Sequence, residues 1–88
     1  QGGYSFLAAK YFHEYGILPA QCQSTKSPCE QQCLGKYAYL NKLEFRVKDY
    51  YYVGGYYGAS NEKNILLELE KNGPLVVSMK VHHSFYNY

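Results

Sequence analysis

Three cysteines close together in the sequence are the residues best suited to covalent or metal chemistry. They are Cys22, Cys29 and Cys33, and the chain has 3 cysteines in all. In a disulfide-forming protein, an odd number of cysteines implies that one pairs with a partner elsewhere. The segment QSTKSP between the first two is polar and turn-like, as in a loop closed by a disulfide. The cysteines therefore predict a disulfide-closed loop.

A zinc site is the alternative for these cysteines. Its fourth ligand would be one of the three histidines, His13, His82 and His83. Structural zinc usually takes its cysteines in close pairs, which Cys29 and Cys33 fit and Cys22 does not. The sequence therefore favours disulfides and predicts no metal site. We expect the histidines to be solvated or packing residues, since they fall on a helix and in a surface turn.

Two adjacent glycines, Gly2 and Gly3, lead into the first periodic segment. Apolar residues recur at three- and four-residue steps over residues 4–15, which predicts a helix that ends at Gly16. No Ser, Thr, Asp or Asn stands ahead of the glycines as a cap. The glycine pair is therefore interpreted as serving a need of the main chain rather than as a helix cap. Residues 17–36 are predicted to be loop, with room for one short turn of helix.

A second helix is predicted after the glycine-rich run GGYYG. Ser60 or Asn61 supplies its N-cap, and Glu62 complements the positive end of its dipole. Gly73 and Pro74 end it in the usual order.

Two segments alternate apolar and polar residues as half-buried strands do. Over residues 43–48, Leu43, Phe45 and Val47 are predicted to face away from Glu44, Arg46 and Lys48. Residues 75–81 repeat the pattern, with the odd-numbered residues on one face. The predicted order is helix, loop, strand, helix, strand. Because a small domain buries only ~60% of its unfolded surface, this set of elements is expected to be part of something larger.

The composition limits the classes of function that the chain could have. The 88 residues carry a formal net charge of +2 and are 47% hydrophobic, so they make one small folded domain at most. The basic residues are dispersed, which argues against nucleic-acid binding. No apolar run reaches the ~20 residues of a membrane span. With 12 tyrosines and no tryptophan, a tyrosine-rich binding module for peptide or carbohydrate is one function that the composition allows.

Four stretches together resemble the papain family of cysteine peptidases, and within it the cathepsin C branch. They are QGGYSFLAAKYFHEYGI, SPCEQQC, YYVGGYYGASNE and NGPLVVSMKVHHSFYNY. The resemblance implies an α+β, two-lobed fold of which this chain is an internal fragment. Residues 1–40 would belong to the helical lobe with its disulfide loop, and residues 41–88 to the β-barrel lobe.

The resemblance also implies a binding site. Gly2 and Gly3 would bind the substrate main chain, Tyr4 would wall the S2 or S3 region, and Ser78 would floor S2. Tyr52 would help to hold a chloride ion beneath S2, and chloride is the one cofactor that the resemblance suggests. A bare glycine backbone suits a peptide that pairs with it as an added strand.

The same resemblance implies a pairing for each of the three cysteines. Cys22 would pair with Cys33, and Cys29 with a cysteine upstream of Gln1. None of them is expected to be the nucleophile, because the catalytic Cys of the family would precede this segment, and its His and Asn would follow Tyr88. The segment alone is therefore expected to be inactive.

The implied parent is a cysteine peptidase that removes N-terminal dipeptides from peptides and proteins. Its partners would be peptide or protein substrate and the remainder of the parent, including a catalytic Cys segment, a His and Asn segment and an exclusion domain. It would act in a lysosomal or other acidic, secretory compartment, or be secreted. A papain-like endopeptidase and a catalytically dead homologue are the alternatives within the family.

Overall fold

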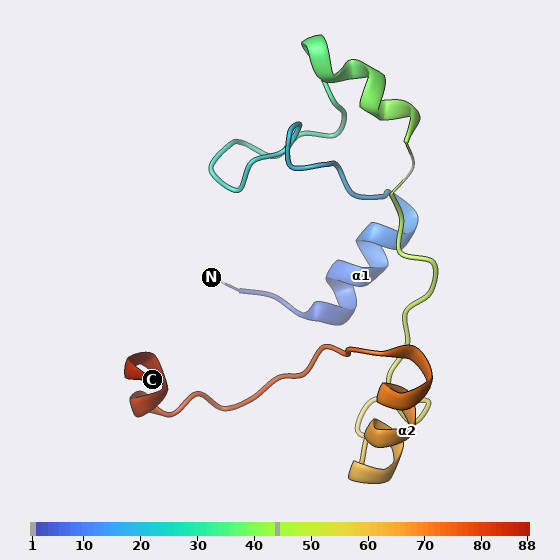
Figure 1. The fold of residues 1–88 in the computed structure, drawn as a ribbon, viewed down its shortest axis with the longest axis vertical. Coiled ribbons are helices and arrows are strands. Elements are labelled where there is room, and N and C mark those ends of the chain that lie inside the picture. The colour runs from blue at the N-terminus through green and yellow to red at the C-terminus, as the bar shows by residue number, and fades with distance from the viewer. Residues whose placement is uncertain (1, 44) are drawn as a thin grey trace. The chain divides into compact units, whose positions relative to one another are not determined.

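The computed structural model describes residues 2–43 and 45–88 of the chain. Its described helical segments are α1 (Ser5–Glu14), the 3₁₀ segment η1 (Gly35–Lys42), α2 (Glu62–Asn72) and the 3₁₀ segment η2 (His83–Asn87) (Figure 1). The chain divides into two compact units, Gln1–Tyr51 and Tyr52–Tyr88. The predicted assignment of residues 1–40 and 41–88 to two lobes stays a prediction.

Helix α1 forms where the apolar spacing predicts it, and it ends as predicted at Gly16. Tyr4 is its extended N-cap residue, with φ −116° and ψ 127°, and gives no side-chain cap. Gly16 has φ +86°, and its N–H donates to the carbonyl oxygen of Phe12 at 3.1 Å. A Cβ at Gly16 would lie 3.0 Å from the carbonyl oxygen of Phe45. Both backbone conformation and packing therefore favour glycine there.

The C-terminal end of α1 is held by residues 45–47, an arrangement that we call the α1 clamp. The N–H of Ile17 donates to the carbonyl oxygen of Phe45 at 2.7 Å. The N–H of Val47 donates to the carbonyl oxygen of Phe12 at 3.2 Å. The carbonyl oxygen of Phe12 thus accepts from both Gly16 and Val47, and residues 45–47 are bonded to α1 and to the residue just beyond Gly16.

Two side chains complete the α1 clamp. Arg46 donates from Nη1 to the carbonyl oxygen of Glu14 at 2.7 Å, and Nδ1 of His13 lies 2.8 Å from the carbonyl oxygen of Val47. A guanidinium at the carbonyl end of a helix also suits the negative end of the helix dipole. The clamp therefore fixes the position of α1 within the first unit.

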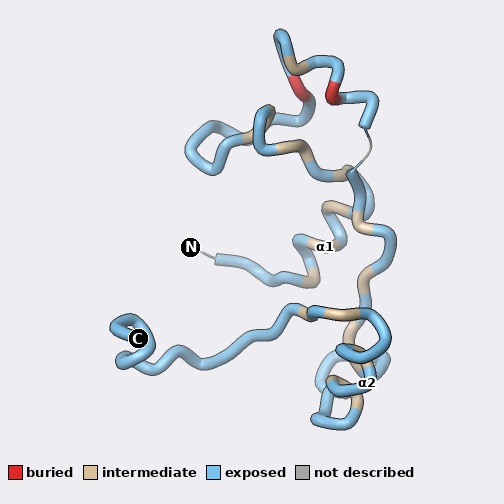
Figure 2. The backbone as a smooth tube through the Cα atoms, viewed as in Figure 1, coloured by how far each residue is buried: buried red, intermediate tan, exposed pale blue. Residues whose placement is uncertain are grey.

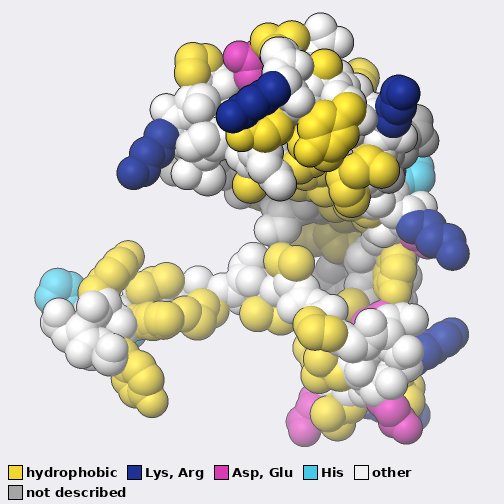
Figure 3. Space-filling view, turned by 45° about the horizontal axis from the view of Figure 1, so that its top comes forward, with side chains coloured by type: hydrophobic (Ala, Val, Ile, Leu, Met, Phe, Trp, Pro, Cys, Tyr) yellow, Lys and Arg dark blue, Asp and Glu magenta, His cyan; other side chains and the backbone are white. Residues whose placement is uncertain are grey.

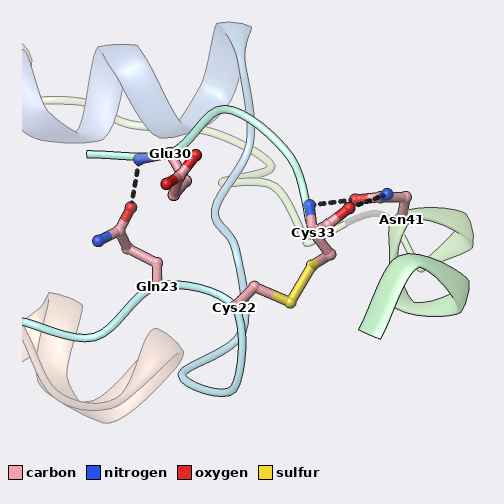
Figure 4. The surroundings of a disulfide bond; sticks show 5 residues. All are labelled: Cys22, Gln23, Glu30, Cys33 and Asn41. Atoms are coloured by element: carbon pink, nitrogen blue, oxygen red, sulfur yellow. Dashed lines mark hydrogen bonds between the residues drawn. A yellow bond between two sulfur atoms is a disulfide. The ribbon is translucent and has the colours of Figure 1, made fainter. Parts of the chain in front are cut away.

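The loop between α1 and η1 is closed by a disulfide between Cys22 and Cys33, with an S–S distance of 2.07 Å (Figure 4). Cys33 is 2% exposed and Leu40, in η1, is 9% exposed. These two are the buried residues of the described chain (Figure 2). The buried residues of the first unit are thus one cysteine of the disulfide and one residue of η1.

The second unit begins with a glycine turn that leads into α2. Gly54 has φ +93°, and a Cβ there would lie 2.6 Å from the carbonyl oxygen of Ala59. Asn61 caps α2, its side chain accepting from the N–H of Asn64 at 2.8 Å. Gly73, with φ +90°, ends the helix. The predicted start and end of this helix are confirmed, and Asn61 rather than Ser60 is the cap.

The two predicted strands are not present among residues 2–43 and 45–88. Glu44, placed in the first of them, lies outside the described residues. In that segment the main chain of Phe45 and Val47 bonds to the end of α1 instead. Sequence alternation reports which side chains could share a face, but a strand also needs a neighbour with which to pair. The α+β, two-lobed fold stays a prediction.

Residues 73–82 form a long irregular stretch between α2 and η2 (Figure 1). The predicted strand over residues 75–81 would have buried one face. Instead the neighbours Val76 and Val77, which would point to opposite faces, are 75% and 71% exposed. Neither face of this stretch is buried by the described residues, so its apolar side chains have no described element to pack against.

The apolar faces of both α-helices lie open. Leu7 in α1 is 57% exposed, and Leu66 and Leu67 in α2 are 57% and 54% exposed. Hydrophobic side chains accordingly lie at the surface in the space-filling view (Figure 3). Amphipathic helices normally bury such faces against another element. Within the described chain, no helix combines the length and the apolar character that crossing a bilayer requires.

Candidate functional site

Gly2 and Gly3 form an exposed segment of bare backbone ahead of α1. A Cβ built on either glycine would meet nothing within 4 Å. Gly3 also lies outside the positive-φ region that favours glycine. Among the described residues, neither packing nor conformation demands glycine at position 3. The absence of a side chain there leaves the main chain open to a group approaching from outside.

Tyr4 links this segment to α1. Its carbonyl oxygen accepts from the N–H of Ala8 at 3.1 Å, so its main chain is fixed to the first turn of the helix. Its side chain is 78% exposed. The first unit therefore has two glycines and a tyrosine as consecutive exposed residues just ahead of α1. The other end of α1 is held by the α1 clamp.

Ser78 lies in the second unit, in the irregular stretch that follows α2. It is exposed, and so are its neighbours Val77 and Met79, at 71% and 61%. The structure thus groups Gly2, Gly3 and Tyr4 in one unit and Ser78 in the other. The S2 role of Ser78 stays a prediction.

Tyr52 also belongs to the second unit and is half-buried. Its ring lies edge-on to the ring of Tyr57, with 5.6 Å between centroids, and its carbonyl oxygen accepts from the N–H of Gly55 at 2.9 Å. A phenol supplies one donor to an anion. The resemblance implies a second donor from the helix, where this chain has Phe6, whose side chain has none. The chloride role of Tyr52 stays a prediction.

The cysteine loop contains the disulfide Cys22–Cys33 and one exposed free thiol, Cys29. The bridge joins the pair that the resemblance implies. It also uses two of the three sulfurs on which the zinc alternative depends. Among residues 2–43 and 45–88, no three His, Cys, Asp or Glu side chains lie together as metal ligands would.

The histidines have structural contacts. His13 belongs to the α1 clamp, while His82 caps η2, its Nδ1 accepting from the N–H of Ser84 at 3.3 Å. The ring of His13 also lies 5.5 Å from that of Tyr50, which in turn packs edge-on against Phe6 at 4.9 Å. The expectation that these histidines are solvated or packing residues stays a prediction.

Two side-chain amides around the disulfide were not among the residues that the sequence singles out. Asn41 bonds to both main-chain polar groups of Cys33, and Gln23 bonds to residues on either side of Cys29. Both are exposed or half-buried polar residues with no motif around them. Because their partners lie several residues away, no local pattern could have found them.

The chain is similar to cathepsin C along nearly its whole length. It is 42% identical, over 89 residues, to cathepsin C from Schistosoma mansoni, an alignment that covers 99% of this chain and 19% of the relative. No family model matches the chain. The chain thus spans about a fifth, 19%, of the length of this curated relative. We conclude that the chain is related in sequence to a region of cathepsin C.

Proposed function

We propose that the chain is a segment of a cathepsin C-like cysteine peptidase that removes dipeptides from the N-termini of peptides and proteins. The observation that carries the proposal is the 42% identity to cathepsin C, which extends over 99% of the chain. The segment supplies a wall of the substrate cleft and part of the S2 pocket. The nucleophilic Cys, its His partner and the orienting Asn come from the rest of the parent, as does any exclusion domain.

The glycine pair supports this role through its backbone. An extended peptide can pair its main chain with an exposed main chain, in the manner of an added strand. Gly2 and Gly3 are exposed, and the space around their Cβ positions is empty within 4 Å. A side chain would occupy that space and hold the peptide away. In this proposal Tyr4 and Ser78 contact the side chains of the substrate, and Tyr52 contributes to a chloride site.

The central test uses Gly3→Val in the complete protein. Because a Cβ at Gly3 meets nothing within 4 Å, the variant is expected to fold as the parent does. If the peptide pairs with this backbone, kcat/KM falls by about tenfold or more, tenfold being ~1.4 kcal/mol of lost transition-state binding. Gln31→Val, in the exposed cysteine loop, is the matched control and leaves kcat/KM unchanged. An unchanged kcat/KM in Gly3→Val contradicts the binding role.

Substrate choice distinguishes the alternatives within the family. The assay compares peptides with a free N-terminus and the same peptides acetylated there. Release of dipeptides from the free form alone supports the exopeptidase. Cleavage of internal bonds in both forms indicates an endopeptidase, and peptide binding without cleavage indicates a dead homologue.

A tyrosine-rich binding module is the candidate from another class. Its support is the exposure of tyrosines such as Tyr56 and Tyr57, at 70% and 83%. A module must fold alone, so a cooperative thermal transition of the isolated chain together with peptide or carbohydrate binding would favour it. The peptidase proposal expects neither, and it expects no activity from the isolated chain.

The proposal includes a lysosomal or secreted location for the parent protein. Disulfides persist in oxidising compartments and are rare in the cytosol. The Cys22–Cys33 bridge is consistent with such a compartment, as is the similarity to cathepsin C. Fractionation of cells that express the complete protein checks this location.

A further inference from the structure

The last residue of α2 is the one asparagine of the sequence that is followed by glycine. The asparagines are Asn41, Asn61, Asn64, Asn72 and Asn87, and only Asn72 precedes a residue without a side chain. The side-chain carbonyl carbon of an asparagine can be attacked by the main-chain nitrogen of the next residue, and a side chain on that residue slows the attack. The Asn72–Gly73 sequence therefore favours loss of the asparagine amide more than any other in the chain.

The backbone at the end of α2 explains why glycine follows Asn72. Gly73 has φ +90°, a conformation that residues with a side chain rarely adopt, and a Cβ there would meet nothing within 4 Å. Asn72 itself is exposed. The glycine that ends the helix thus also leaves an exposed asparagine beside a main-chain nitrogen with no side chain to shield it.

Two hydrogen bonds hold the reacting groups in the folded helix. The N–H of Gly73 donates to the carbonyl oxygen of Leu69 at 3.0 Å, which engages the attacking nitrogen. Nδ2 of Asn72, the group that would leave, donates to Oε2 of Glu68. Glu68 and Asn72 are four residues apart, the spacing at which side chains meet on a helix. Because helix ends open locally without global unfolding, the reaction would proceed from the opened last turn.

We propose that Asn72 is a site of spontaneous deamidation, and that Glu68 restrains the reaction by holding the side-chain amide on the last turn of α2. The nitrogen of Gly73 gives its proton to a base in the solvent and attacks Cγ of Asn72. A new C–N bond forms, the bond between Cγ and Nδ2 breaks, and Nδ2 takes a proton and leaves as ammonia. Water then opens the cyclic imide at either of its carbonyl carbons, which gives aspartate or isoaspartate. The net reaction consumes water and releases ammonia, and nothing is oxidised or reduced.

The product would change the charge at the end of α2. A carboxylate at position 72 would lie one turn from the carboxylate of Glu68, in place of the amide that now donates to it. Like charges at this spacing destabilise a helix, and a negative charge also opposes the negative end of the helix dipole. Isoaspartate adds a carbon to the main chain as well. Deamidation is thus expected to loosen the last turn of α2.

The experiment follows the amide of Asn72 in the complete protein, kept folded at neutral pH and sampled over several weeks. Cleavage after lysine places Asn72 in residues 72–80 and Asn64 in residues 64–71, so the two asparagines within α2 are counted separately. Mass spectrometry distinguishes the carboxylate from the amide, and a sample without incubation gives the background. The variants are Glu68→Ala, Glu68→Gln, which keeps an acceptor, and Glu70→Ala, the matched control that removes the same charge from the same helix.

We expect Asn72 to deamidate in the parent protein, while Asn64, which precedes Ile65, does not. In Glu68→Ala the rate at Asn72 should rise about fivefold, the factor that corresponds to ~1 kcal/mol for the lost hydrogen bond. Because alanine favours helix, a faster rate reports the lost bond rather than a weaker helix. Glu68→Gln should stay closer to the parent than to Glu68→Ala, and Glu70→Ala should match the parent.

Deamidation at Asn72 no faster than at Asn64 overturns the site. Equal rates in Glu68→Ala and Glu70→Ala overturn the restraining role of Glu68, and so does a Glu68→Gln rate equal to that of Glu68→Ala. If circular dichroism shows that Glu68→Ala has lost its helices, Glu68→Asp decides, because its shorter side chain keeps the charge but not the reach. A faster rate in Glu68→Asp then supports the proposal, and the parent rate overturns it.

Discussion

The imidazole Nδ1 of His13 donates a hydrogen bond to the main-chain carbonyl oxygen of Val47, at 2.8 Å and across 34 residues of sequence. A carbonyl oxygen only accepts, so Nδ1 must carry the hydrogen. The bond joins α1 to residues 45–47 and fixes the orientation of the imidazole ring. The bond belongs to the α1 clamp, which holds the helix that follows the glycine pair.

Removing this bond should loosen the clamp. We expect His13→Ala to cost about 1 kcal/mol locally, since it leaves the carbonyl oxygen of Val47 without this donor. Amide hydrogen exchange in the complete protein should then be about fivefold faster at Ile17 and Val47. His83→Ala, an exposed histidine outside the clamp, is the control. Equal protection in His13→Ala and the control would show that the bond contributes nothing.

The cap of α2 can be tested against its neighbour. Asn61→Ala removes the acceptor for the N–H of Asn64 and should lower the free energy of unfolding by about 1 kcal/mol. Ser60→Ala should change it by less than about 0.5 kcal/mol, as at an ordinary surface site. Urea denaturation of the complete protein measures both. The opposite order would assign the cap to Ser60.

Substitutions at the adjacent Gly54 and Gly55 distinguish the cost of backbone strain from the cost of steric overlap with other atoms. Gly54→Ala places Cβ 2.6 Å from the carbonyl oxygen of Ala59, at φ +93°. Gly55→Ala meets nothing within 4 Å, at φ +105°. We expect Gly55→Ala to cost about 1 kcal/mol from backbone strain alone, and Gly54→Ala to cost at least 2 kcal/mol more because main-chain atoms must move. Equal losses in denaturation would contradict the overlap at Gly54.

Chloride dependence tests the role of Tyr52. The peptidase activity of the complete protein is measured while chloride is replaced by acetate at constant ionic strength. If the phenol holds chloride, activity rises with chloride in the parent, and Tyr52→Phe weakens that response about tenfold in chloride concentration, the effect of ~1.4 kcal/mol. Tyr57→Phe, whose ring contacts Tyr52, is the control. A parent enzyme indifferent to chloride removes the ion from the proposal.

The helices were predictable because their signals are local. The apolar spacing of α1, its end at Gly16, and the Asn61 and Gly73 boundaries of α2 all depend on residues within a few positions of one another. The sequence left Ser60 and Asn61 open as caps, because both residue types can accept from the first turn. Only the geometry of the turn selects between them.

The remaining structure depends on partners far along the chain. Phe45 and Val47 alternate as strand residues do, yet their main chain bonds to the end of α1. The segment η1 lacks a strong periodic pattern, and its buried residue is Leu40. The bond between Asn41 and Cys33 joins residues with no motif in common. Within the candidate site, the exposed glycine pair was predicted, whereas the amides around the cysteines were not.

The Cys22–Cys33 disulfide would keep the chain covalently connected even if the main chain between the two cysteines were cut. Lys26 is exposed and lies between the bridged cysteines, and exposed loop tips are preferred points of limited proteolysis. A nick there would end the continuity of the polypeptide while sulfur kept both fragments in one molecule. The nicked protein would travel as a single band on a gel until a reductant released the pieces.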